Sequence, residues 1–209
     1  MDKDYIREQI EHLGLNKKVE LEKIPSIDLY MDQVITFFDD VLGHTKRYEE
    51  DKLLTKTMIN NYTKDKLLMP AVKKKYTREH IMLMILLYNL KHILSISDIK
   101  QLFDVAVHND NADSTRLTQI YQLYLKCRQK EAEDFTRQVE ETIDSLCNEI
   151  KSMQIEKEDK LEDMLLVMLL VEQAAYYKRL AEKIIDSRLM KENATDTKIK
   201  SQKVGDGSK

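Results

Sequence analysis

The sequence predicts a mainly α-helical protein, and its composition supports this class. The 209 residues include only four glycines, two prolines and no tryptophan. Sandwiches, barrels and propellers need glycine and proline at many turns, whereas long helices exclude both residues from their interiors. Apolar residues make up 42% and charged residues 34% of the chain, which suffices for a hydrophobic core beneath a charged surface. We expect a helical N-terminal domain followed by a C-terminal domain of long helices.

Residues 1–24 are predicted to form an N-terminal extension, and the first clear helix follows Pro25. Within the extension, scattered apolar residues indicate one short helix that ends near Gly14. From Ile27 to Leu42, apolar residues recur at spacings of three and four. Ser26 is suited to cap this helix, and Gly43 is suited to end it. The polar residues 44–52 then predict a loop.

A short helix and a turn come next. Thr55 begins a predicted helix that continues to Lys64, and Pro70 bars helix beyond the preceding residue. Residues 71–76 contain three consecutive lysines and predict a small turn or hairpin.

Two further helices complete the predicted N-terminal domain, 25–103. Thr77 is suited to cap a helix that runs to about Ile93. Residues 81–88 are apolar throughout, so this helix is predicted to lie in the core with its side chains buried on every face. Ser97 is suited to cap a shorter helix through Phe103.

The second half of the chain is predicted to be a helical domain, 115–190, after a linker at 104–114 that is rich in Asn and Asp. Ser114 is suited to cap a helix that reaches about residue 153. Its second half carries a seam close to a heptad, which needs a partner helix. A last helix, about 161–190, has a first half that is apolar on all faces, and we expect several neighbours to bury it. We expect a disordered tail at 191–209. The seam consists of Phe135, Val139, Ile143, Leu146, Ile150 and Met153.

Positive charge is concentrated in residues 52–78. Eight basic residues and one acidic residue give this segment a charge of +7; because the whole chain carries −3, the other 182 residues carry −10. Such a separation creates a local positive field that favours a polyanionic partner. The alternative is a solvated lysine face without a partner.

Helical geometry extends this argument to the short helix. Met58, Ile59 and Tyr62 share one side and would anchor it to the core, and Lys56 lies at the edge of the opposite side. The opposite side carries Thr57, Asn60, Asn61 and Lys64 and no carboxylate. Asparagine pairs bidentately with adenine in the major groove, and lysine and threonine reach phosphates or base edges. The alternative is a merely polar surface, although asparagine is a poor helix former.

A family resemblance adds to this interpretation. Residues 58–70 (MINNYTKDKLLMP) resemble the end of the recognition helix in the MerR family of transcription regulators. Residues 75–81 resemble that family's wing exit and third-helix cap, and residues 90–91 and 95–103 resemble its fourth helix. The resemblance covers about 27–103. Residues 29–33 and 54–62 also resemble an uncharacterised bacterial family known as domain of unknown function 1836.

The MerR resemblance implies a winged helix-turn-helix that binds double-stranded DNA as a homodimer, in a cytoplasmic, sequence-specific transcriptional regulator. The second helix would enter the major groove and the lysine wing would grip the adjacent backbone. The long helix with the seam would form the dimer. The predicted DNA contacts are Lys56, Thr57, Asn60, Asn61, Lys64, Lys73, Lys74, Lys75 and Arg78.

This sequence departs from the MerR pattern at three places. The family's glycine before two leucines is Lys66, and its Gly-Tyr-Arg wing becomes Lys74-Lys75-Tyr76. Its recognition-helix arginine corresponds to Asn60, so its base preference is not carried over.

The sequence contains no motif typical of catalysis, cofactor binding or metal binding, so we expect that the protein is not an enzyme. His80 and His92 are interpreted as a capping and a surface residue. Cys127 and Cys147 fall in one predicted helix, about 30 Å apart at about 1.5 Å per residue, which excludes a disulfide between them within the chain and fits a reducing cytoplasm. No uncharged run reaches the roughly 18 residues that span a membrane.

Two alternatives remain open. An apolar small-molecule effector would bind a pocket formed by methionines and tyrosines of the second half, or these side chains fill a core or a dimer interface. They are Tyr124, Met153, Met164, Met168, Tyr176 and Tyr177. The alternative function is a helical protein-protein adaptor that does not bind DNA.

Overall fold

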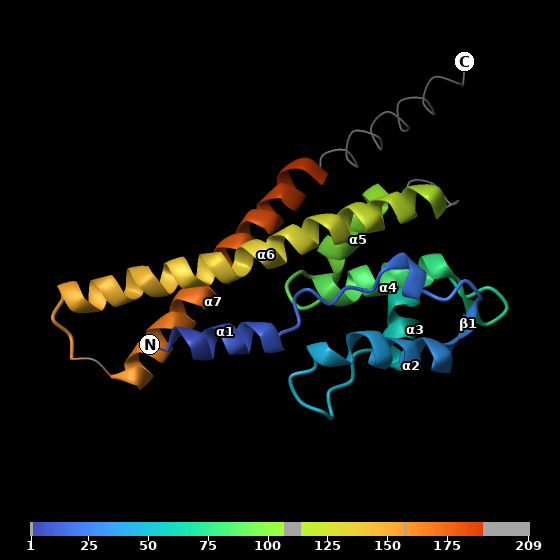
Figure 1. Ribbon diagram of the computed structural model, residues 1–209. Coiled ribbons are helices and arrows are strands. Elements are labelled where there is room, and N and C mark those ends of the chain that lie inside the picture. The colour runs from blue at the N-terminus through green and yellow to red at the C-terminus, as the bar shows by residue number, and fades with distance from the viewer. Residues whose placement is uncertain (1, 107–113, 157, 190–209) are drawn as a thin grey trace, which may run out of the picture.

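A computed structural model describes residues 2–106, 114–156 and 158–189 as a mainly helical protein (Figure 1). Short 3-10 turns and a terminal π-helical turn, η3 (Ile185–Leu189), accompany the helices. Strands β1 (Leu29–Tyr30) and β2 (Lys75–Tyr76) pair antiparallel, with Leu29 opposite Tyr76. The helices are α1 (Lys3–His12), α2 (Met31–Leu42), α3 (Lys56–Lys64), α4 (Arg78–Leu90), α5 (Ile96–Ala106), α6 (Ser114–Ser152) and α7 (Asp159–Ile184).

The larger hydrophobic core surrounds α4. Nine consecutive residues of this helix, from His80 to Tyr88, are buried, which confirms the prediction of a core helix. Val34 and Phe38 of α2 and Ile59 of α3 join them with essentially no exposure. This packing fixes α3 against the body and leaves its other face free.

The same core continues into the long helix. Leu117 and Tyr121 of α6 and Ile185 of η3 belong to it, and the Tyr121 hydroxyl donates to the Val19 carbonyl at 2.6 Å. Segment 104–114, predicted as a linker, therefore does not divide the core. Residues 104–106 are helical as part of α5, and 107–113 lie outside the described residues, as does the predicted tail 191–209.

A second, smaller core forms around the predicted seam of α6. Val139, Ile143, Leu146 and Ile150 are buried, and Leu166 of α7 completes the buried cluster. Ile6 and Ile10 of α1 cover it, and Arg7 donates to Glu140 at 2.6 Å. The seam has a partner helix, as predicted, but the partners are α7 and α1 of the same chain. Burial of these four side chains within one chain does not favour the dimerisation role predicted for the seam, which stays a prediction.

Two cap assignments and one helix end differ from the prediction. Helix α2 begins at Met31, because residues 29 and 30 pair with β2 instead, so Ser26 caps nothing and Ile27 is 70% exposed. Helix α5 is capped by Ser95: its hydroxyl accepts from the Asp98 N–H at 3.2 Å, and the Asp98 carboxylate accepts from the Ser95 N–H at 3.3 Å. Helix α4 ends at Leu90, which leaves Ile93 in a turn.

Helix α7 is less buried than predicted. Its first half contacts α6 on one side only, through residues such as Leu166. Met164, Val167, Met168 and Val171 are 51–64% exposed, because no described element lies over that side. At the end of the seam, Met153 is also exposed.

Candidate nucleic-acid interface

Helix α3 presents a polar face to solvent. The Thr55 hydroxyl caps it by accepting from the Met58 N–H at 3.2 Å, and Ile59 and Tyr62 anchor it in the core. The prediction of an exposed face is confirmed. The four residues of that face, Thr57, Asn60, Asn61 and Lys64, are all exposed.

The chain leaves α3 through a Schellman motif. The Leu67 N–H donates to the Tyr62 carbonyl at 2.8 Å and the Lys66 N–H donates to the Thr63 carbonyl at 3.1 Å. Lys66 has φ +60°, in the left-handed region that favours glycine. Leu67 and Leu68 then enter the core. Lys66, which lacks the conformational freedom of glycine, therefore occupies the left-handed position of this turn.

The lysine run forms a tight hairpin turn, which we call the wing turn, Val72 to Lys75. The two end residues exchange backbone hydrogen bonds of 2.9 and 3.0 Å. Lys73 (φ +50°) and Lys74 (φ +64°) occupy its two central positions, and both side chains are exposed. Positive φ at both central residues is the type I′ geometry of two-residue hairpins. The turn therefore projects two lysines from one point.

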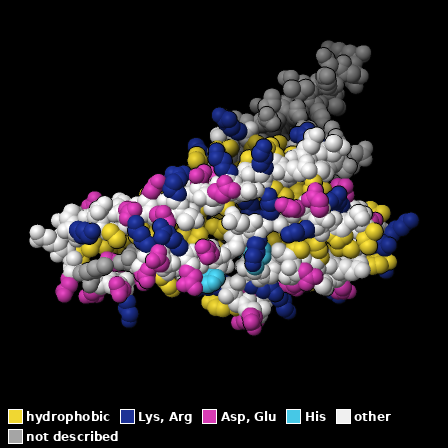
Figure 2. All heavy atoms as spheres, viewed as in Figure 1, with side chains coloured by type: hydrophobic (Ala, Val, Ile, Leu, Met, Phe, Trp, Pro, Cys, Tyr) yellow, Lys and Arg dark blue, Asp and Glu magenta, His cyan; other side chains and the backbone are white. Residues whose placement is uncertain are grey.

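Lys56, at the edge of the exposed face, and Lys75 of the wing turn both contact the chain at the start of α2. The Lys56 ammonium lies 2.7 Å from the Asp32 carboxylate, and the Lys75 ammonium lies 5.1 Å from the Tyr30 ring centroid. Both lysines therefore contact residues only two positions apart. Basic side chains project from this end of the molecule (Figure 2). Sequence reasoning missed Asp32, because only the packing of α2 on α3 brings that acid to the interface.

Besides Lys56, two predicted DNA contacts have structural partners. The Arg78 guanidinium donates to the Leu21 carbonyl, and its buried Nε has no hydrogen-bond partner. This arginine ties the N-terminal segment to α4, and its role as a DNA contact stays a prediction. Lys75 is half-buried over the Tyr30 ring, so it supports the wing turn more than it extends from it.

His80 joins the segments that flank the wing turn. Its Nδ1 accepts from the Thr77 N–H at 3.1 Å, so Nε2 donates to the Met69 carbonyl, also at 3.1 Å. The ring packs edge-on against Tyr76, with 5.6 Å between centroids. Burial lowers the pKa of this imidazole, which keeps it neutral and suits both hydrogen bonds. The predicted capping role is confirmed.

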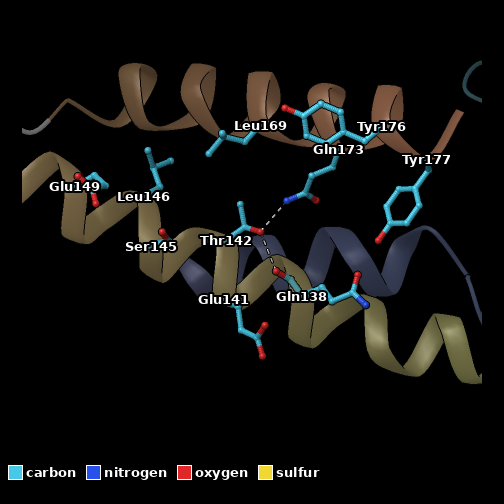
Figure 3. A pocket seen from close by; sticks show the side chains of 10 residues that line it. All are labelled: Gln138, Glu141, Thr142, Ser145, Leu146, Glu149, Leu169, Gln173, Tyr176 and Tyr177. Carbon is cyan, nitrogen blue, oxygen red and sulfur yellow. Dashed lines mark hydrogen bonds between the residues drawn. The ribbon is translucent and has the colours of Figure 1, made fainter. Parts of the chain in front are cut away.

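The candidate effector pocket is an open groove of about 720 Å³ between α6 and α7 (Figure 3). Tyr176 and Tyr177 line it, and Gln173 donates across it to the Thr142 hydroxyl at 3.2 Å. The other predicted lining residues, Tyr124, Met153, Met164 and Met168, are not among its walls. The methionines of α7 are exposed away from this groove.

A family model described as a domain of unknown function (DUF1836) matches residues 19–124, just over half of the chain. The chain belongs to this family. The DUF1836 region begins at Val19 and ends one turn beyond Tyr121, the two residues joined by the buried hydrogen bond described above. It therefore contains most of the larger core, the exposed face of α3 and the wing turn.

No curated protein and no solved structure matches the chain. None of the helices in the described ranges is long and apolar enough to cross a membrane. Within those ranges, no group of three or more histidine, cysteine or acidic side chains is placed to hold a metal ion.

Proposed function

We propose that this DUF1836 protein binds double-stranded DNA as a sequence-specific transcriptional regulator. The observation that carries the proposal is the exposed amide-bearing face of α3, at whose edge Lys56 contacts the start of α2, as Lys75 of the wing turn also does. Helix α3 would enter the major groove, and the wing turn would contact the neighbouring phosphates. Repulsion by DNA explains why this face of α3 carries no acid.

Two backbone conformations support a winged helix-turn-helix of MerR type. The resemblance places glycines of that family at the positions of Lys66 and Lys74, and both have positive φ here. Glycine is the residue that adopts this conformation without steric cost. Lys66 and Lys74 thus have the backbone conformation that glycine favours, which supports the resemblance although the side chains differ.

The residues divide into two roles. Asn60 and Asn61 have the short amide side chains that read base edges, so they would give sequence preference. Lys64, Lys73 and Lys74 are exposed cations, so they would contact phosphates and give salt-dependent affinity. Lys56 would contribute less, because Asp32 already pairs with it.

Binding to a mixed-sequence duplex across a salt series tests the phosphate contacts. We expect a steep fall of log affinity with log salt, and Lys64→Ala should lower that slope by about one. Lys126→Ala, at an exposed lysine of α6, is the matched control and should leave the slope unchanged. A Lys64→Ala slope equal to the wild-type slope would contradict the assignment.

Base reading needs a separate test with a duplex selected from a random library. Asn60→Ala should weaken the selected duplex by about 1–3 kcal/mol more than a scrambled duplex. Equal losses on both duplexes would mean that Asn60 does not read bases.

The alternative, an adaptor that binds protein partners, is favoured by one observation, the exposed apolar side of α7. In that case DNA binding would be weak, and replacement of the lysines of the α3 face and wing turn would leave its salt slope unchanged.

A further inference from the structure

Helix α7 exposes an apolar stripe. Its four large residues, Met164, Val167, Met168 and Val171, have the spacing i, i+3, i+4 and i+7, so they lie along one side of the helix. The smaller side chains of residues 174 and 175 continue the stripe by a further turn. The buried Leu166 and Glu162 lie on the opposite side, where Leu166 packs in the smaller core with α6. The stripe therefore belongs to neither core.

The stripe has the pattern of a helix that packs on another helix. Apolar positions every three and four residues form the seam of a coiled coil. Each of the four large side chains is more than half exposed, which corresponds to roughly 100 Å² apiece. With the small residues and the lysine stems beside them, one copy offers about 500 Å² and two copies about 1,000 Å², the area at which specific interfaces begin.

The charges at the ends of α7 favour one orientation. Near the start of the helix the exposed residues Asp159, Lys160 and Asp163 carry a charge of −1, because Glu162 is buried on the side away from the stripe, whereas residues 178–183 carry three basic residues and one acid, a charge of +2. Two parallel copies would place like charges together. Two antiparallel copies place the acidic end of each helix beside the basic end of the other, which lowers their electrostatic energy.

We propose that α7 pairs with α7 of a second copy of this chain, antiparallel and about a two-fold axis near Val171. In this register Met164 lies opposite Lys178 of the second copy, and Lys160 lies near Glu182 of the second copy. A two-fold contact uses the same surface on both copies, as this stripe would. The proposal does not rest on DNA binding, because the stripe lies outside the α3 face and the wing turn.

The first test is the mass of the full-length protein in solution without DNA, by sedimentation equilibrium from 1 to 200 µM. We expect a monomer-dimer equilibrium within this range. Val171→Glu would place two carboxylates face to face and should weaken dimerisation at least about 100-fold. Ile27→Glu, at a residue that is 70% exposed, is the matched control and should leave the equilibrium unchanged.

The second test fixes the register by disulfide formation in a Cys127→Ser/Cys147→Ser background. Under mild oxidation Val171→Cys should form a covalent dimer. Met164→Cys and Lys178→Cys should form one only when the two variants are mixed. Three results would each overturn the proposal. They are a protein that is monomeric at every concentration, a dimer whose dissociation is unchanged by Val171→Glu, and crosslinking of Met164→Cys with itself. Loss of DNA binding alone would leave these measurements unchanged.

Discussion

The wing turn allows stability and DNA binding to be changed in opposite directions. Lys73 and Lys74 both have positive φ, a conformation that costs a non-glycine residue about 1–2 kcal/mol. Asn-Gly is the pair that a type I′ turn favours most. We therefore expect the double variant Lys73→Asn/Lys74→Gly to be more stable by about 1–2 kcal/mol. For a chain of this size that corresponds to a rise in Tm of about 2–4 °C per kcal/mol.

The same variant removes two cations from the proposed phosphate contacts. The slope of log affinity against log salt should fall by about two, in the duplex assay described above. Lys126→Gln/Lys130→Gln on α6 removes the same charge elsewhere and should leave the slope near the wild-type value. Thermal unfolding and the salt series are measured on the same preparations, so that a loss of binding is not confused with unfolding.

Two results would refute this reasoning. A variant that is less stable would show that the two lysine side chains stabilise the turn despite their backbone conformation. A variant that is more stable and binds DNA with an unchanged slope would show that the wing turn does not contact phosphates.

Three further predictions concern the surroundings of this site. Lys66→Gly should raise stability by about 1 kcal/mol by relieving its positive φ, whereas Lys64→Gly within α3 should lower it; equal effects in thermal unfolding would contradict this. Because the pKa of His80 is lowered from 6.5, the unfolded state binds more protons, and stability should fall as pH drops below about 6.5; His80→Gln should flatten this fall in urea unfolding, leaving the contributions of His44 and His92, whose pKa values are also lowered by burial. Asp32→Asn should tighten DNA binding while changing stability by less than about 1 kcal/mol, since the pair it breaks is exposed; weaker binding would mean that Asp32 positions Lys56 productively.

Local patterns in the sequence predicted most helices and the exposed face. Periodicity placed the inward residues of α2, α3 and α4, and the same geometry placed Thr57, Asn60 and Asn61 outside, because the spacing of apolar residues is enough to orient a helix. The capping residues were predicted less accurately than the buried and exposed sides of the helices. Ser26 and Ser97 have the right chemistry, but strand pairing and a neighbouring serine decided the actual ends.

What the sequence alone determined is thus the helical class, the location of the positive segment and the outward side of α3, since these follow from composition and from contacts near in sequence. Only the tertiary structure decided which surfaces are covered. In the folded chain the seam of α6 packs against α7 and α1, and the Arg78 guanidinium donates to the Leu21 carbonyl. The stripe of α7 remains exposed. An apolar pattern indicates that one face of a helix must be covered by another segment, but which segment covers it depends on how parts of the chain that are distant in sequence pack together.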